Sequence, residues 1–151
     1  MTQIAASLFA ALLFLCAVPA QAEGDQPARS PKDTVAGYLG SMQAHEFEKA
    51  FDFVSSTMTA GKGREEWAKE QQYIVEMGEV KIFGFEPFEA VQVTDTHAKV
   101  PNILKSQDKF LNQLGLDEYE LYELLKEGGD WKIDNQTLVE GVGRAEFFPG
   151  E

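Results

Sequence analysis

The chain has 151 residues, of which 44% are hydrophobic, and it carries a formal net charge of −12 at pH 7. This length suits one domain that buries a core of its own. Because nucleic acids and anionic membrane surfaces bind clustered Lys and Arg, the negative charge argues against both as partners. We expect the acidity to serve mainly solubility.

An apolar run, Ile4–Val18, lies near the N-terminus, and the small-x-small sequence Ala-Gln-Ala follows it at 20–22. This pattern is typical of a secretory signal peptide with its peptidase site. We therefore expect residues 1–22 to be a signal peptide cleaved after Ala22, and the mature protein to be periplasmic or secreted. The alternative is an uncleaved anchor, for which the run is short and lacks flanking basic residues.

Cys16 is the only cysteine, and it lies inside the apolar run. A lipoprotein signal requires a small residue before the cysteine, whereas Leu15 is large, so we expect no lipid anchor. Cleavage would remove Cys16 together with the signal peptide. The mature chain is then expected to have no disulfide, no thiol chemistry and no stable membrane anchor.

The rest of the chain divides into a short polar linker at 23–29, a domain at 30–140 and a C-terminal tail at 141–151. The tail contains the paired aromatic residues Phe147 and Phe148. Such residues are expected to dock on their own domain. The alternatives are that they seal a dimer or fill a partner's groove.

Three helices are predicted at the start of the domain. Ser30 suits the N-cap of the first helix, and Pro31 suits its first turn. Gly37 and Gly40 lie within this helix and indicate close packing against a neighbour. Its apolar stripe consists of Val35, Tyr38, Leu39 and Met42. The second and third helices are predicted over 46–55 and 64–78.

After the third helix the sequence turns to β-branched and aromatic residues. A strand is predicted over 79–93, with a bend or bulge at Pro87. A second strand is predicted over 98–104, where Pro101 indicates an edge or bulged position. The connection at 105–115 can include a helical turn.

Residues 116–127 contain good helix formers, but we favour a strand. The reason is that Gly128-Gly129 suits a two-residue hairpin turn and 131–139 suits the returning strand. A slip by one residue would change every pair of this hairpin. The predicted pairs are Glu127–Asp130, Lys126–Trp131, Leu125–Lys132, Leu124–Ile133, Glu123–Asp134, Tyr122–Asn135 and Leu121–Gln136.

Helices followed by a bent antiparallel sheet indicate an α+β domain. In the segments "TVAGYLGSMQAHEFEKAFDFVS", "REEWAKEQQYIVEMGEV" and "YELLKEGGDWKID", the chain resembles the nuclear transport factor 2-like superfamily. More closely, it looks like small exported members of that superfamily whose function is unknown. The resemblance covers most of residues 30–140 and includes no diagnostic catalytic motif.

The resemblance implies a cone, in which a strongly curved antiparallel sheet wraps round the N-terminal helices and leaves a pocket at the open end. The superfamily includes isomerases, dehydratases, cyclases and hydrolases, and also members that only bind or dimerise. The fold therefore does not settle the function.

Two sets of acid–base candidates follow from the predicted strands. Glu123 and Asp134 would face each other across the hairpin, where two carboxylates repel. If buried, such a pair could act in acid–base catalysis. The alternative is that both carboxylates lie on a solvated face, where Lys132 reduces their repulsion. His97 lies at a turn, near Asp95. It could be a base that the Asp95 carboxylate orients, and the alternative is a solvated turn residue.

The chain has no phosphate loop, nucleophile elbow or zinc motif, and neither histidine has metal-ligand spacing. We therefore expect no metal and no cofactor. Aromatic and polar side chains could still line a ligand pocket, although an aromatic residue at helical spacing is more often part of the core. The candidates for pocket lining are Tyr38, Trp67, Tyr73, Tyr122, Trp131 and Asn135.

Two functions remain open. The favoured one is an exported non-catalytic module that binds a small apolar ligand or associates with itself, as a homodimer, or with another protein. The alternative is a small enzyme of the isomerase or dehydratase kind with acid–base residues in an apolar pocket. An ionisable side chain that points into the cone beside a tyrosine would favour the enzyme.

Overall fold

The computed structural model describes residues 28–150. The predicted signal peptide, Cys16 and the cleavage site therefore lie outside the described residues. Within residues 28–150, no helix is long and apolar enough to cross a membrane. The elements in chain order are α1 (Pro31–Gln43), α2 (Phe47–Ala50), η1 (Phe51–Phe53), α3 (Arg64–Gly78), β1 (Lys81–Pro87), β2 (His97–Gln107), β3 (Asp117–Glu127), β4 (Asp130–Leu138) and α4 (Val142–Phe147).

The three predicted helices are confirmed, and the second consists of α2 and the 3-10 helix η1. Ser30 caps α1, because its Oγ accepts a hydrogen bond of 3.1 Å from the backbone N–H of Asp33. Pro31 is the first residue of that helix. The third predicted helix, α3, ends at Gly78 as predicted, and the next residue, Glu79, adopts the left-handed conformation with φ of 51°.

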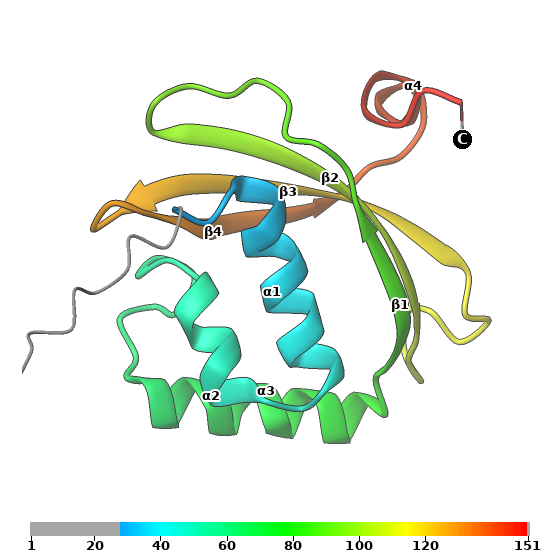
Figure 1. The fold of residues 1–151 in the computed structure, drawn as a ribbon. Coiled ribbons are helices and arrows are strands. Elements are labelled where there is room, and N and C mark those ends of the chain that lie inside the picture. Colours follow the sequence, from blue (N-terminus) through cyan, green and yellow to red (C-terminus); the bar gives the residue numbers. More distant parts are fainter. Residues whose placement is uncertain (1–27, 151) are drawn as a thin grey trace, which may run out of the picture.

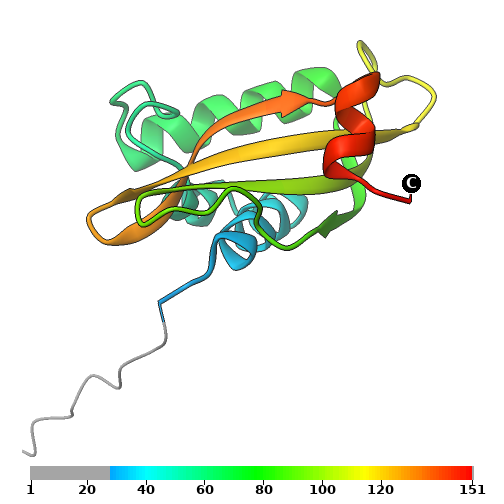
Figure 2. The same cartoon turned by 90° about the horizontal axis from the view of Figure 1, so that it is seen from above.

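The four strands form one antiparallel sheet in the order β1-β2-β3-β4. The sheet is strongly curved, and α1 lies on its concave side, between the sheet and α3 (Figure 1). Helix α4 lies on the opposite, convex side (Figures 1 and 2). The predicted α+β architecture is therefore confirmed, with helices packed in a sheet that curls without closing into a barrel.

The main core lies between the helices and the concave face of the sheet. Gly37 allows close packing there, because a Cβ at this position would lie 2.6 Å from Cζ of Phe53. A Cβ at Gly40 would lie 3.7 Å from Phe85, which is ordinary contact. The buried apolar cluster comprises Val35, Tyr38, Leu39, Ala50, Phe53, Val54, Trp67, Ala98, Val100, Tyr122, Leu124, Trp131 and Ile133.

The hairpin turn is confirmed, with both Gly128 and Gly129 at positive φ. Four predicted pairs, from Glu127–Asp130 to Leu124–Ile133, are also confirmed. Beyond them a β-bulge shifts the register, so that the pairs become Glu123–Asn135, Tyr122–Gln136 and Leu121–Thr137.

The predicted pairs Glu123–Asp134, Tyr122–Asn135 and Leu121–Gln136 are therefore wrong. The extra residue in β4 is Asp134, and its carboxylate accepts a hydrogen bond of 2.7 Å from Oγ of Ser55. The backbone N–H of Ser55 also donates to the carbonyl of Ile133 at 2.8 Å. The segment that follows η1 thus binds the edge of β4 where the strand bulges.

Both prolines differ in part from the prediction. Pro87 ends β1, and the bulge of that strand lies between Ile82 and Gly84 instead. Pro101 lies in the internal strand β2, but its carbonyl accepts a hydrogen bond from Phe88, where the regular pairing with β1 has ended. Because the N and O of a strand residue face the same side, the nitrogen of Pro101, which has no N–H, faces the end of β1 and not β3, and the pairing of β2 with β3 is unaffected.

The convex face carries the C-terminal segment. The ring of Phe148 is buried and packs edge-to-face on Tyr119, at 4.9 Å between centroids, and on Phe88, at 5.6 Å. The guanidinium of Arg144 stacks 3.5 Å from the centroid of Tyr119. Phe148 thus docks on its own domain, as expected.

Candidate functional site

A buried carboxylate lies on the concave face of the sheet. Glu120 of β3 is 1% exposed, and its carboxylate accepts hydrogen bonds from Asn102 Nδ2 at 2.8 Å, Tyr122 Oη at 3.0 Å and Gln136 Nε2 at 2.5 Å. The ladder explains this convergence, because Asn102 pairs with Glu120 and Gln136 pairs with Tyr122. Side chains two residues apart on a strand share a face. We call Asn102, Glu120, Tyr122 and Gln136 the Glu120 cluster.

Burial controls the electrostatics of the cluster. It raises the pKa of Glu120 above its ordinary value, although the three hydrogen bonds favour the charged form. Burial also raises the pKa of Tyr38 to about 12 and that of Tyr122 well above its ordinary value, and the charge of Glu120 adds to both shifts. None of the ion pairs within residues 28–150 involves Glu120. The carboxylate therefore has donors but no cation beside it.

Two side chains of the cluster differ from the rest in their hydrogen bonding or exposure. Oδ1 of the fully buried Asn102 has no hydrogen-bond partner among residues 28–150. Such an oxygen is costly unless a donor reaches it. Gln136, in contrast, is exposed, and its amide covers Oε1 of Glu120. The oxygen of Asn102 can therefore accept a further donor, and the side chain of Gln136, which covers Glu120, faces solvent.

A groove of about 370 Å³ lies at the end of the sheet, where β3 begins and β4 ends. Three leucines on its wall are exposed, Leu111 at 93%, Leu116 at 64% and Leu138 at 58%. Leu138 is the strand partner of Glu120, although no residue of the Glu120 cluster lines the groove itself. We call it the leucine groove. Its other lining residues are Asn112, Asp117, Glu118, Tyr119, Val139, Glu140, Gly141 and Arg144.

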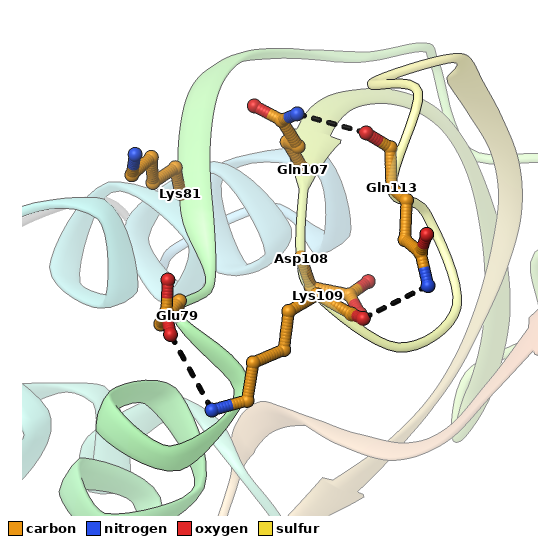
Figure 3. Close-up of a pocket in the computed structure, with 6 residues that line it drawn as sticks. All are labelled: Glu79, Lys81, Gln107, Asp108, Lys109 and Gln113. Carbon is orange, nitrogen blue, oxygen red and sulfur yellow. Dashed lines mark hydrogen bonds and ion pairs between the residues drawn. The ribbon is translucent and has the colours of Figure 1, made fainter.

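The loop at 108–116, which presents two of these leucines, is held by its own polar groups. The carboxylate of Asp108 accepts hydrogen bonds from the backbone N–H groups of Leu111, Phe110 and Asn112, and these lower its pKa. Figure 3 shows the neighbouring polar notch, where Lys109 pairs with Glu79 at 3.4 Å and the Gln107 amide donates to the carbonyl of Gln113. The loop is thus anchored between the end of α3 and β2.

The structure brings the three predicted acid–base residues around a different groove, of about 290 Å³. Each is engaged elsewhere: His97 Nδ1 lies 2.9 Å from Oγ1 of Thr96, Glu123 lies 3.5 Å from Nζ of Lys99, and Asp134 binds Ser55. The side chain of Glu123 points to the face opposite Tyr122, since strand side chains alternate. No group of acidic and histidine residues in 28–150 could hold a metal ion.

The six predicted pocket residues fall into three sets. Tyr38 and Tyr122 meet edge-to-face, with 6.4 Å between centroids, beside Glu120. Trp67 and Trp131 are buried in the core. Tyr73 is exposed on α3, and Asn135 is exposed and donates to Glu123, away from the cluster.

Sequence reasoning missed Glu120, Asn102, Gln136 and the leucine groove. A signal for Glu120 exists, because it alternates with Tyr122 and Leu124 on the predicted core side of the strand. A carboxylate in that series predicts a buried polar group. No comparable signal marks Asn102 or Gln136, whose positions depend on the register.

No protein-family model matches the chain, and no curated protein matches it. Solved structures do resemble it. A domain of unknown function with a cystatin-like fold from Nostoc punctiforme is 16% identical, with a TM-score of 0.53 over 77% of this chain and 79% of that chain. A nuclear transport factor 2-like protein from Cytophaga hutchinsonii is 11% identical, with a TM-score of 0.51 over 72% and 93%.

A ketosteroid isomerase-like protein from Erwinia carotovora atroseptica is 18% identical, with a TM-score of 0.50 over 72% of this chain and 92% of that chain. At such identities the likeness establishes the fold alone. The chain has the nuclear transport factor 2-like fold, as its sequence predicted.

Proposed function

We propose that the protein is an exported, non-catalytic module that binds a small, largely apolar molecule at the open end of its curved sheet. The observation that carries this proposal is the gathering of Leu111, Leu116 and Leu138 around one groove. Exposed apolar side chains that cluster in a concave site usually have an occupant.

The size and chemistry of the leucine groove fit a small ligand. Its volume of about 370 Å³ lies within the usual range of ligand sites. Such sites combine apolar walls with a few polar groups that orient the ligand. Here the leucines supply the walls, and the Glu120 cluster lies next to Leu138 as a polar end.

Export is part of the proposal and is supported by the apolar run and the Ala-Gln-Ala site at residues 20–22. Expression in a host with a secretory pathway tests it. We expect to find the protein in the exported fraction, with the mass of a chain that starts at Glu23. Retention of full-length protein in the cytoplasm would contradict export.

Ligand binding is tested by titrating the mature protein with Nile red, a neutral apolar dye. We expect Leu138→Ser to weaken dye binding about tenfold, because it removes apolar contact of order 1.5 kcal/mol. Val142→Ser is the matched control, since Val142 is exposed and does not line the groove. Equal affinities for the two variants, or no binding to the wild type, would contradict the proposal.

An acid–base enzyme of the isomerase or dehydratase kind is the second candidate. It is favoured by Glu120, an ionisable group on the concave face that accepts a hydrogen bond from Tyr122 and has a raised pKa. The test is the exchange of α-hydrogens of a cyclic ketone in heavy water, followed by NMR. Faster exchange with wild type than with Glu120→Gln would support an enzyme, and equal rates would contradict it.

A further inference from the structure

The carboxylate of Glu120 is hydrogen-bonded but has no positively charged partner among the described residues. The three hydrogen bonds to the carboxylate all come from neutral groups, Asn102, Tyr122 and Gln136. No Lys or Arg among residues 28–150 forms an ion pair with it. A buried carboxylate without a cation is costly, so a cationic group that reached Glu120 would be bound strongly.

A second buried acceptor lies within the same cluster. Asn102 is fully buried and uses its Nδ2 for Glu120, while its Oδ1 has no partner among the described residues. Carboxylate and amide oxygens both accept, so a group with several N–H donors can satisfy both. A protonated amine has three donors and a positive charge, whereas a hydroxyl has one donor and no charge.

Gln136 is the member of the cluster that can leave. Its side chain is exposed on β4, whereas Asn102 and Tyr122 are fully buried. Its amide is the group that covers Oε1 of Glu120. Rotation of this side chain into solvent would expose Oε1 without moving the backbone or the core.

The surroundings favour a cation over an anion. Asp117, Glu118 and Glu140 line the adjacent leucine groove, and its arginine, Arg144, is stacked on Tyr119. The chain as a whole carries a formal charge of −12. A ligand with a carboxylate would meet repulsion there, whereas a protonated amine would be attracted.

We propose that the ligand is an apolar molecule with a protonated amine, which displaces Gln136 and binds Glu120 and Asn102 while its apolar part lies along Leu138 in the leucine groove. This inference rests on the proposed binding function. It adds the chemical class of the ligand and assigns Gln136 as the side chain that the amine displaces from Glu120.

Three probes with the same tail test the inference, namely n-hexylamine, n-hexanol and n-hexanoate, each titrated at pH 7 as a competitor of Nile red. We expect the amine to bind about tenfold tighter than the alcohol, as a charged hydrogen bond implies. The hexanoate should bind most weakly. Equal binding of all three would overturn the amine inference and leave the apolar groove standing, whereas no competition by any of them would contradict the proposed function too.

Variants separate the roles of the residues. Glu120→Gln should reduce hexylamine affinity about tenfold, to that of hexanol, while Glu123→Gln, which removes the same charge from the opposite face of β3, should leave it unchanged. Gln136→Ala should raise hexylamine affinity several-fold without affecting hexanol, because it removes the competitor from an exposed position. Lower hexylamine affinity in Gln136→Ala, or the same loss in both glutamate variants, would overturn the inference.

Discussion

The hydroxyl of Tyr122 donates a hydrogen bond of 3.0 Å to Glu120, two residues before it in β3. This pair places a carboxylate on the face of the sheet that otherwise builds the core. The concave face is therefore not wholly apolar, and both functional hypotheses assign a role to Glu120. It serves either as the polar end of a binding site or as an acid–base group.

The first prediction concerns the pH dependence of stability. Because burial raises the pKa of Glu120 above its ordinary value of 4.5, the folded chain holds this proton at pH values where the unfolded chain has released it. The free energy of unfolding should therefore fall as pH rises from about 4.5 through the folded pKa of Glu120. Glu120→Gln should lack this decrease.

Urea titrations at a series of pH values measure this pH dependence of the free energy of unfolding. The difference in unfolding free energy between Glu120→Gln and wild type should become more favourable to the variant as pH rises. Glu123→Gln is the control, since its partly exposed pair with Lys99 contributes little, and we expect little change between pH 5 and 8. A difference for Glu120→Gln that stays constant with pH would contradict a raised pKa of Glu120.

The second prediction concerns the core. Trp131 is buried beside Ile133 and Leu124, so Trp131→Ala should lower the free energy of unfolding by about 3–5 kcal/mol. Tyr73→Ala removes an aromatic ring that is 63% exposed and should change it by about 0.5 kcal/mol or less. Denaturant titration compares the two. Similar losses for both would show that Trp131 is not in the core.

The third prediction compares two glycines of α1. Gly37→Ala should be destabilising by about 1–3 kcal/mol, because its Cβ would overlap the buried ring of Phe53 and force that ring to shift within the core. Gly40→Ala makes only ordinary contact and should stabilise the helix by about 0.5–1 kcal/mol. Thermal unfolding of both variants should therefore shift in opposite directions. A shift in the same direction would contradict the close approach of α1 to η1.

The fourth prediction concerns the convex face. Phe148 anchors α4 through its contacts with Tyr119 and Phe88, so Phe148→Ala should speed hydrogen exchange in residues 142–148. Val142→Ala changes an exposed side chain and should alter hydrogen exchange in this segment only slightly. Exchange followed by mass spectrometry measures both. Unchanged protection in Phe148→Ala would mean that α4 is held by other contacts.

The β-hairpin shows how far local sequence determines structure. Gly128 and Gly129 require a tight turn, and the turn sets the four pairs next to it, which the sequence predicted. No local pattern predicts the bulge at Asp134, where Ser55, which is distant in sequence, binds the edge of β4. The partners of Glu123 and Tyr122 beyond the bulge therefore differ from those that the turn alone predicts.

The candidate site was less predictable than the fold. The predicted set included Tyr38 and Tyr122, because aromatic residues at regular spacing are visible in the sequence. Glu120 does not stand out among the many acidic residues of the chain, although its alternation with Tyr122 marks the core side. Asn102 and Gln136 join it only through pairing between strands, which no local pattern specifies.

The central claim is that the open end of the sheet holds a small ligand. Native mass spectrometry of the mature protein, purified gently from an exporting host, tests it most directly. The account predicts a reproducible additional mass that Leu138→Ser loses and Val142→Ser retains. A wild-type spectrum with the mass of residues 23–151 alone, unchanged after addition of hexylamine, would contradict it.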